Sequence, residues 1–173
     1  RFGHVSPTTA QAVQEELGEY LDSTDFILDG GPSSVGVEST IIDCTSGAPR
    51  ILRPGAITDE MIETSTGLKV SNAVSDIRVS GSLENHYSPE ATVSLNRIPE
   101  SGEGFIALSE QQTPTGVIRL ASPNSVEEFA RLMYSALRDA DAKGVKSVVV
   151  IEPIGDGLAL AIRDRLMRAS KGR

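Results

Sequence analysis

The chain has 173 residues, of which 39% are hydrophobic and 23% charged, with a net charge of −8. These values are typical of one ordinary globular domain or two small ones, and the negative charge argues against a protein that binds duplex nucleic acid. We expect no membrane span and no signal peptide, because no apolar stretch reaches the roughly 18 residues that a span needs. The lone cysteine, Cys44, fits a reducing compartment and a cytoplasmic protein.

The first predicted element is a helix that begins near residue 6. Ser6 before Pro7 suits an N-cap, and residues 8–11 also fit a capping box. The apolar residues that follow recur at helical spacing: Ala10, Val13, Leu17 and Leu21.

Three strands are expected next, over residues 25–31, 35–44 and 48–55. The second and third are separated by a turn at residues 45–48. A short helix over 58–63 should follow, with Thr58 as its cap.

From Thr92 onward, strands alternate with helices. Strands are predicted over 92–95, 104–109, 115–121 and 147–153, and helices over 125–144 and 156–173. Ser125 and Glu128 fit a capping box at the start of the first of these helices. This alternation predicts an α/β layer with a mostly parallel sheet.

Ser39, Thr40 and Arg53 are the residues of the strand pair that suggest chemistry. Neighbouring side chains of a strand point to opposite faces, so one hydroxyl can face a ligand such as an amino acid. Arg53 precedes Pro54-Gly55, a rigid turn that fixes where the guanidinium lies, and arginine binds phosphate with two hydrogen bonds. The alternatives are an ordinary strand threonine and a surface ion pair.

Other motifs give no site. Two histidines, His4 and His86, and one cysteine are too few for zinc, so no metal site is predicted. A serine hydrolase would need a G-x-S-x-G elbow, which is absent. The glycine pair around Asp156 is read as a strand-to-helix turn, and the basic residues of the last helix as a solvated face or a complement to its dipole.

Taken together and in order, several blocks resemble the threonylcarbamoyl-AMP synthases, YrdC-like enzymes of the long, two-domain form. The blocks are S-P-T-T-A-Q-A-V, G-V-E-S-T-I-I-D, I-L-R-P-G-A-I-T, E-N-H-Y-S-P-E-A and D-G-L-A-L-A-I-R. The resemblance implies residues 1–70 as the remainder of a twisted YrdC-like α/β catalytic domain. Residues 71–91 would be a linker and lid, and 92–173 a small Rossmann-like, mostly parallel α/β domain.

The family forms threonylcarbamoyl-AMP and pyrophosphate from L-threonine, bicarbonate and ATP, with Mg²⁺ expected on the phosphates, for tRNA modification. The resemblance implies that Ser39 binds L-threonine and that Arg53 binds ATP. Ser6 and Thr8 would lie near the nucleotide. Residues Asn85, His86 and Tyr87 would close over the site and contact ATP. It identifies no catalytic residue, and it suggests tRNA or the downstream tRNA-modifying complex as a partner.

The K-x-R and S-x-N segments of the family's nucleotide site precede the block where this chain begins. We therefore expect a fragment of a nucleotidyltransferase that is inactive by itself. The alternative is a non-catalytic α/β module that binds a small molecule or regulates a partner.

Overall fold

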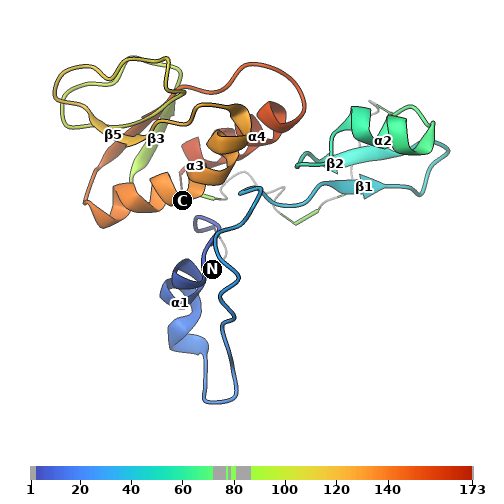
Figure 1. Ribbon diagram of the computed structural model, residues 1–173, viewed down its shortest axis with the longest axis horizontal. Coiled ribbons are helices and arrows are strands. Elements are labelled where there is room, and N and C mark those ends of the chain that lie inside the picture. The colour runs from blue at the N-terminus through green and yellow to red at the C-terminus, as the bar shows by residue number, and fades with distance from the viewer. Residues whose placement is uncertain (1–2, 72–76, 78, 81–86, 173) are drawn as a thin grey trace.

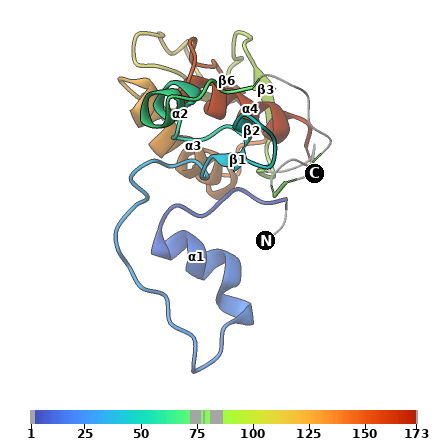
Figure 2. The ribbon, with the colours of Figure 1, turned by 90° about the vertical axis from the view of Figure 1, so that its right-hand side faces the viewer.

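The structure is a computed structural model that describes the chain apart from residues 1–2, 72–76, 78, 81–86 and 173. Figure 1 shows three parts: an α/β layer, a β-hairpin with one helix, and an N-terminal segment that carries a short helix. The hairpin and the N-terminal helix extend from the α/β layer in different directions. In the turned view of Figure 2 the hairpin overlaps the layer, and the N-terminal helix lies below both.

The α/β layer contains a sheet of parallel strands: β3 (Thr92–Leu95), β4 (Gly104–Ile106), β5 (Ile118–Ala121) and β6 (Ser147–Val150). Their order is β3-β6-β4-β5, so the last strand in sequence lies between β3 and β4. The three valines of β6 are fully buried, as expected for a strand covered on both faces. The predicted mostly parallel α/β layer is therefore confirmed.

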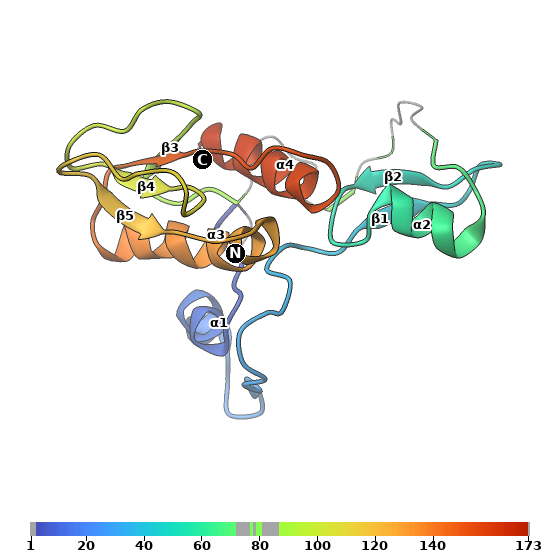
Figure 3. The same ribbon diagram turned by 45° about the horizontal axis from the view of Figure 1, so that its top comes forward.

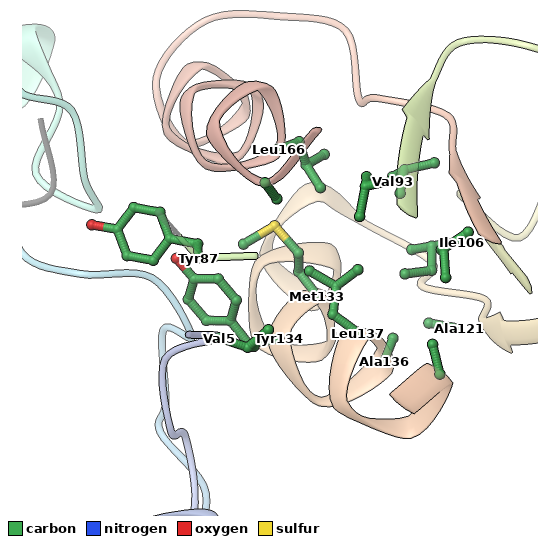
Figure 4. Packing of buried hydrophobic residues seen from close by; sticks show 14 of the residues in the cluster. Val5, Tyr87, Val93, Ile106, Ala121, Met133, Tyr134, Ala136, Leu137 and Leu166 are labelled. Carbon is green, nitrogen blue, oxygen red and sulfur yellow. The ribbon is translucent and has the colours of Figure 1, made fainter. Parts of the chain in front are cut away.

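Helices α3 (Val126–Ala142) and α4 (Leu158–Ser170) cover one face of this sheet (Figure 3). The predicted cap of α3 is confirmed, because the Ser125 hydroxyl accepts from the Glu128 amide at 3.2 Å. Met133 and Leu137 of α3 and Leu166 of α4 pack with strand residues in one apolar cluster (Figure 4). A doubly wound fold has helices on both faces, whereas here the other face carries a smaller cluster around Phe105.

The hairpin pairs β1 (Ile41–Asp43) with β2 (Arg50–Arg53) in antiparallel fashion, and α2 (Asp59–Thr66) follows. Thr58 caps α2 as predicted, accepting from the Met61 amide at 3.3 Å. The two strands are shorter than the sequence pattern indicated, because only three or four residues of each form the ladder.

An ion pair joins the hairpin strands, with Arg50 Nη2 donating to Asp43 Oδ2 at 2.6 Å. The Thr45 hydroxyl, the Arg50 guanidinium and the Thr45 amide all donate to this carboxylate and lower the pKa of Asp43 to about 2. The ordinary value is 3.8, so the folded-state pKa is depressed. The ionised carboxylate therefore contributes its full stabilisation above the unfolded-state pKa of 3.8, and this contribution is lost as the pH falls through the folded-state pKa of about 2.

We expect Asp43→Asn to lower the free energy of unfolding near neutral pH and to differ less and less from the unaltered protein as the pH falls from about 5 to about 2. Urea unfolding at a series of pH values measures this difference. Asp139→Asn is the control, since Asp139 lies on an exposed helix face 3.7 Å from Lys143. A difference that stays constant over that range contradicts the assignment.

The N-terminal helix α1 (Ala10–Leu17) begins later than the sequence suggested and leads into a short 3-10 turn, η1 (Gly18–Tyr20). Thr9 is its cap, accepting from the Ala12 amide at 3.1 Å. The prediction of a cap at Ser6, or of a capping box over 8–11, was wrong. Ser6 lies outside the cap position because the helix begins at Ala10, and its hydroxyl donates to Glu38 instead.

Arg138 of α3 holds the N-terminal segment against the α/β layer. Its guanidinium donates to Glu16 Oε1 at 3.1 Å and to the carbonyl of Val5. Gly36 also lies against α3, since a Cβ atom there would lie 2.2 Å from the Ala130 carbonyl oxygen. The chain is thus fastened to α3 immediately before it enters the hairpin.

No strand forms over 25–31, so that prediction was wrong. Phe26 and Leu28 are 84% and 91% exposed. An apolar run becomes a strand only when another strand pairs with it, and the described residues supply no such partner for this segment.

Candidate functional site

The structure brings Ser39 and Arg53 together. Arg53 Nε and Nη2 donate to the Ser39 carbonyl oxygen at 3.0 and 2.9 Å, and Nη2 also lies 3.2 Å from Ser39 Oγ. Arg53 Nη1 donates to the Ser80 carbonyl at 2.9 Å, so the guanidinium joins three chain segments. Since Ser39 is exposed, a hydroxyl and a cation are presented side by side at the surface.

Thr40, the neighbouring hydroxyl, has a structural partner instead. Its Oγ1 donates to the Ile57 carbonyl at 2.7 Å and accepts from the Ile57 amide at 3.1 Å. Thr40 therefore ties the turn after β2 to the segment that precedes β1. The two adjacent hydroxyls have different roles, which leaves Ser39 as the one accessible to a ligand.

The turn after Arg53 needs a glycine at position 55, because the backbone of another segment lies directly against it. A Cβ atom at this position would lie 2.5 Å from the Thr40 amide nitrogen, 2.6 Å from the Glu38 carbonyl oxygen and 2.8 Å from the Ser39 carbonyl carbon. The turn lies directly on the backbone of residues 38–40, and no side chain fits between them. This close contact fixes Arg53 relative to Ser39.

Glu38 is the centre of a polar cluster that was not predicted from the sequence. Its carboxylate accepts from Ser6 Oγ at 2.5 Å, from Arg165 Nε at 2.8 Å and from the Tyr134 hydroxyl at 3.0 Å. Arg165 has no exposed side-chain surface, and its guanidinium lies 5.6 Å from the ring centre of Tyr87. We call Ser6, Glu38, Tyr87, Tyr134 and Arg165 the Glu38 cluster.

The sequence contained one signal for this cluster. Arg165 lies at helical spacing with Ile162, Leu166 and Ala169, all of them buried, so a cation occupies the apolar face of its helix. A buried cation requires a buried partner. The interpretation of the last helix's arginines as a solvated face was therefore wrong for Arg165.

The cluster keeps its groups in defined protonation states. Burial raises the pKa of the Glu38 carboxyl, but hydrogen bonds from Arg165 and Ser6 outweigh burial and lower the pKa overall. Burial, with the charge of Glu38 as the next cause, raises the pKa of Tyr134 well above its usual value. At neutral pH Glu38 is thus an anion, and Tyr134 is a neutral donor to it.

The other predicted site residues lie in different places relative to the Ser39–Arg53 pair and the Glu38 cluster. Ser6 belongs to the Glu38 cluster, and the Thr8 carbonyl accepts from the Ser33 amide at 2.8 Å. Tyr87 is 1% exposed, with its ring stacked 5.8 Å from that of Tyr134 (Figure 4). Asn85 and His86 lie outside the described residues. Ligand contacts of all these residues stay predictions.

A cavity of about 350 Å³ lies beside the site, between the hairpin and the start of α4. Pro54 and Gly55 line it from the turn after β2, and Asp156 and Gly157 line it from the loop before α4. Neither Ser39 nor Arg53 lines this cavity. Ser39 is exposed whereas Arg53 is half-buried, so a ligand would approach the pair from the side of Ser39.

Residues 57–171 match a family model described as threonylcarbamoyl-AMP synthase, C-terminal domain, and residues 1–55 match one described as telomere recombination. The chain belongs to the threonylcarbamoyl-AMP synthase family. The resemblance found from the motifs is confirmed.

Relatives of this family are similar over nearly the whole chain. The threonylcarbamoyl-AMP synthases of Pyrococcus abyssi and Bacillus subtilis are 34% and 32% identical to it, over 97% and 99% of the chain. The chain spans 55% of the length of each relative.

Solved structures give the same result. The crystal structure of P. abyssi Sua5 complexed with L-threonine matches with a TM-score of 0.78 and 32% identity, covering 98% of this chain and 55% of that one. A variant of P. abyssi Sua5, with alanine replacing a histidine and the tyrosine after it, matches with a TM-score of 0.69 and 30% identity, covering 98% of this chain and 54% of that one.

Proposed function

We propose that this chain is part of an enzyme that makes L-threonylcarbamoyladenylate for tRNA modification. L-Threonine, bicarbonate and ATP would give threonylcarbamoyl-AMP, pyrophosphate and water. The observation that carries the proposal is the contact of Arg53 with both the carbonyl and the hydroxyl of Ser39, held by Gly55 and Thr40 in a chain of this family. The alternative of a non-catalytic module is not favoured, because the relatives that match nearly the whole chain are synthases.

In this proposal Ser39 binds L-threonine. A hydroxyl can donate to the carboxylate of an amino acid and accept from its ammonium group. The P. abyssi structure that contains L-threonine supports the substrate class.

Arg53 would bind the phosphates of ATP. The carbamate oxygen of carbamoylated threonine would form a bond to the α-phosphorus, and the bond from that phosphorus to the β-phosphate oxygen would break to release pyrophosphate. A fixed guanidinium next to Ser39 would neutralise charge on the phosphates as the new bond forms. Mg²⁺ would be bound largely by the ATP phosphates and would offset their charge.

Ser6 and Thr8 would lie near the nucleotide, and Asn85, His86 and Tyr87 would form the lid and contact ATP. For this role Tyr87 would have to leave its buried position against Tyr134. A histidine–tyrosine pair was altered in the P. abyssi variant, and this supports His86 and Tyr87 as candidates for ligand contacts.

The proposed division of the chain is a catalytic portion over 1–70, the lid over 71–91 and an α/β domain over 92–173. Because the chain spans 55% of its relatives' length, we propose that turnover needs the rest of that length. In the described residues, no helix is long and apolar enough to cross a membrane. A cytoplasmic location, with tRNA or the tRNA-modifying complex as a partner, completes the proposal.

The test measures pyrophosphate release from ATP by the longer protein that contains this chain, with and without L-threonine and bicarbonate. We expect release to depend on both, and Ser39→Ala to raise the KM for L-threonine by roughly tenfold or more, with a smaller effect on the KM for ATP. Ser46→Ala, in the exposed turn of the same hairpin, is the matched control. Release that is independent of L-threonine contradicts the proposal.

A further inference from the structure

The Glu38 cluster connects the α/β layer to the residue next to Ser39. Glu38 comes from the segment that enters the hairpin, whereas Tyr134 and Arg165 come from α3 and α4. The sequence separations from Glu38 are 96 and 127 residues. The contact therefore joins parts of the chain that are distant in sequence.

We infer that Glu38 is a positioning residue, through which Arg165 and Tyr134 of the α/β layer fix the backbone where Ser39 and Arg53 meet. The inference rests on the proposed function, and it assigns the α/β layer a role in binding L-threonine. None of these three side chains needs to contact a substrate for this role.

The directions of the side chains support an indirect role. Along an extended segment, adjacent side chains point to opposite sides. Glu38 points toward the helices, where its carboxylate accepts hydrogen bonds, whereas Ser39 is exposed. The two residues share a peptide unit whose carbonyl oxygen would lie 2.6 Å from a Cβ atom at Gly55. A shift of Glu38 is thus transmitted to Ser39 and to the turn that carries Arg53.

The segment is held at two further points. At Gly36 its backbone touches α3, since a Cβ there would lie 2.2 Å from the Ala130 carbonyl oxygen. At Thr40 the hydroxyl joins it to Ile57. Glu38 lies between these points, and its ion pair with Arg165 selects one register of the segment against the helices.

The composition of the cluster also favours a positional role over a stabilising one. Arg165 is buried with Nη1 on Asp164 Oδ2 at 2.7 Å, and its Nη2 atom has no hydrogen-bond partner among the residues that the structure describes. A buried ion pair with an unsatisfied donor is seldom more stable than an apolar replacement, and its best-attested use is to fix a register. The cluster fits that use.

The experiment compares four variants of the longer protein that contains this chain. Arg165→Met removes the charge and keeps the stem, Arg165→Lys retains a cation, and Tyr134→Phe removes one hydroxyl. Arg163→Met is the control, because it makes the same change on the same helix, where Arg163 donates to the Pro153 carbonyl instead. The readouts are kcat and KM for L-threonine and for ATP, calorimetric L-threonine binding, and hydrogen exchange of the amides of 36–40.

We expect Arg165→Met to raise the KM and the dissociation constant for L-threonine by about tenfold or more, and to speed exchange over 36–40. Arg165→Lys should recover part of this loss, and Tyr134→Phe should show a loss of roughly threefold. Arg163→Met should resemble the unaltered protein. A purely structural role would lower the amount of folded enzyme but leave the KM of the folded fraction unchanged.

The two hypotheses fail differently. If the unaltered protein releases no pyrophosphate in response to L-threonine, the proposed function is wrong. If it does so, and Arg165→Met keeps both the KM and the exchange rates, the positioning role is wrong. Should Arg165→Met fail to fold, Tyr134→Phe decides, because an unchanged KM for L-threonine in that variant also overturns the inference.

Discussion

Replacing Arg53 with alanine should lower kcat/KM for threonine-dependent pyrophosphate release by roughly 10²- to 10³-fold in the longer protein that contains this chain. The guanidinium donates two hydrogen bonds to the Ser39 carbonyl oxygen and a third to the Ser80 carbonyl oxygen. It is therefore in place before ATP binds. A preorganised cation stabilises developing phosphate charge without reorganisation, which accounts for the large expected loss.

Arg53→Lys separates charge from geometry. Lysine keeps the positive charge but cannot place two N–H donors on one carbonyl oxygen as arginine does here. We expect an intermediate loss, with KM for ATP less affected than in Arg53→Ala. Arg131→Ala, on the exposed side of α3, is the control. A kcat/KM for Arg53→Ala within about twofold of the unaltered protein contradicts a role in catalysis.

The α/β layer could be predicted closely because its local patterns and its packing agree. The run over 92–95 was predicted as a strand and is β3, and Ser125 was predicted as a cap and is one. Each of these elements finds its partner within the layer. Local preference and tertiary context then point to the same structure.

The N-terminal segment was predicted less well because its residues have distant partners. Ser6 has the preferences of a helix cap, but its hydroxyl is used by Glu38, 32 residues away. The run over 25–31 has the apolar character of a strand, but the described residues give it no neighbour. A local sequence pattern cannot show that a distant residue will bind a side chain, or that a segment will lack a neighbouring strand.

The candidate site divides in the same way. Ser39 and Arg53 stood out by residue type, because a hydroxyl and a fixed cation beside two strands suggest a ligand. Glu38, Tyr134 and Arg165 were missed because their link depends on how the two helices pack. One local sign of that link was present in the sequence, an arginine on an otherwise apolar helix face, and the structure shows that this arginine, Arg165, is buried.

The second large effect is expected for Gly55→Ala. A methyl group at this position would lie 2.5–2.8 Å from backbone atoms of Glu38, Ser39 and Thr40, and backbone cannot rotate away as a side chain can. The turn must therefore move off the segment and take Arg53 with it. We expect a loss of about 1–3 kcal/mol in the free energy of unfolding. We also expect a fall of about 10²-fold in kcat/KM, because small displacements of positioned groups are costly.

Gly47→Ala is the matched control for this change. Gly47 lies in the turn of the same hairpin, and a Cβ atom there would meet nothing within 4 Å. Urea unfolding and pyrophosphate release, measured on both variants of the longer protein, separate close backbone contact from the loss of a glycine as such. If both variants behave alike, the turn does not need its glycine for contact with residues 38–40. A loss confined to Gly55→Ala means that the packing of one turn on one peptide segment fixes the distance between the proposed threonine and phosphate contacts.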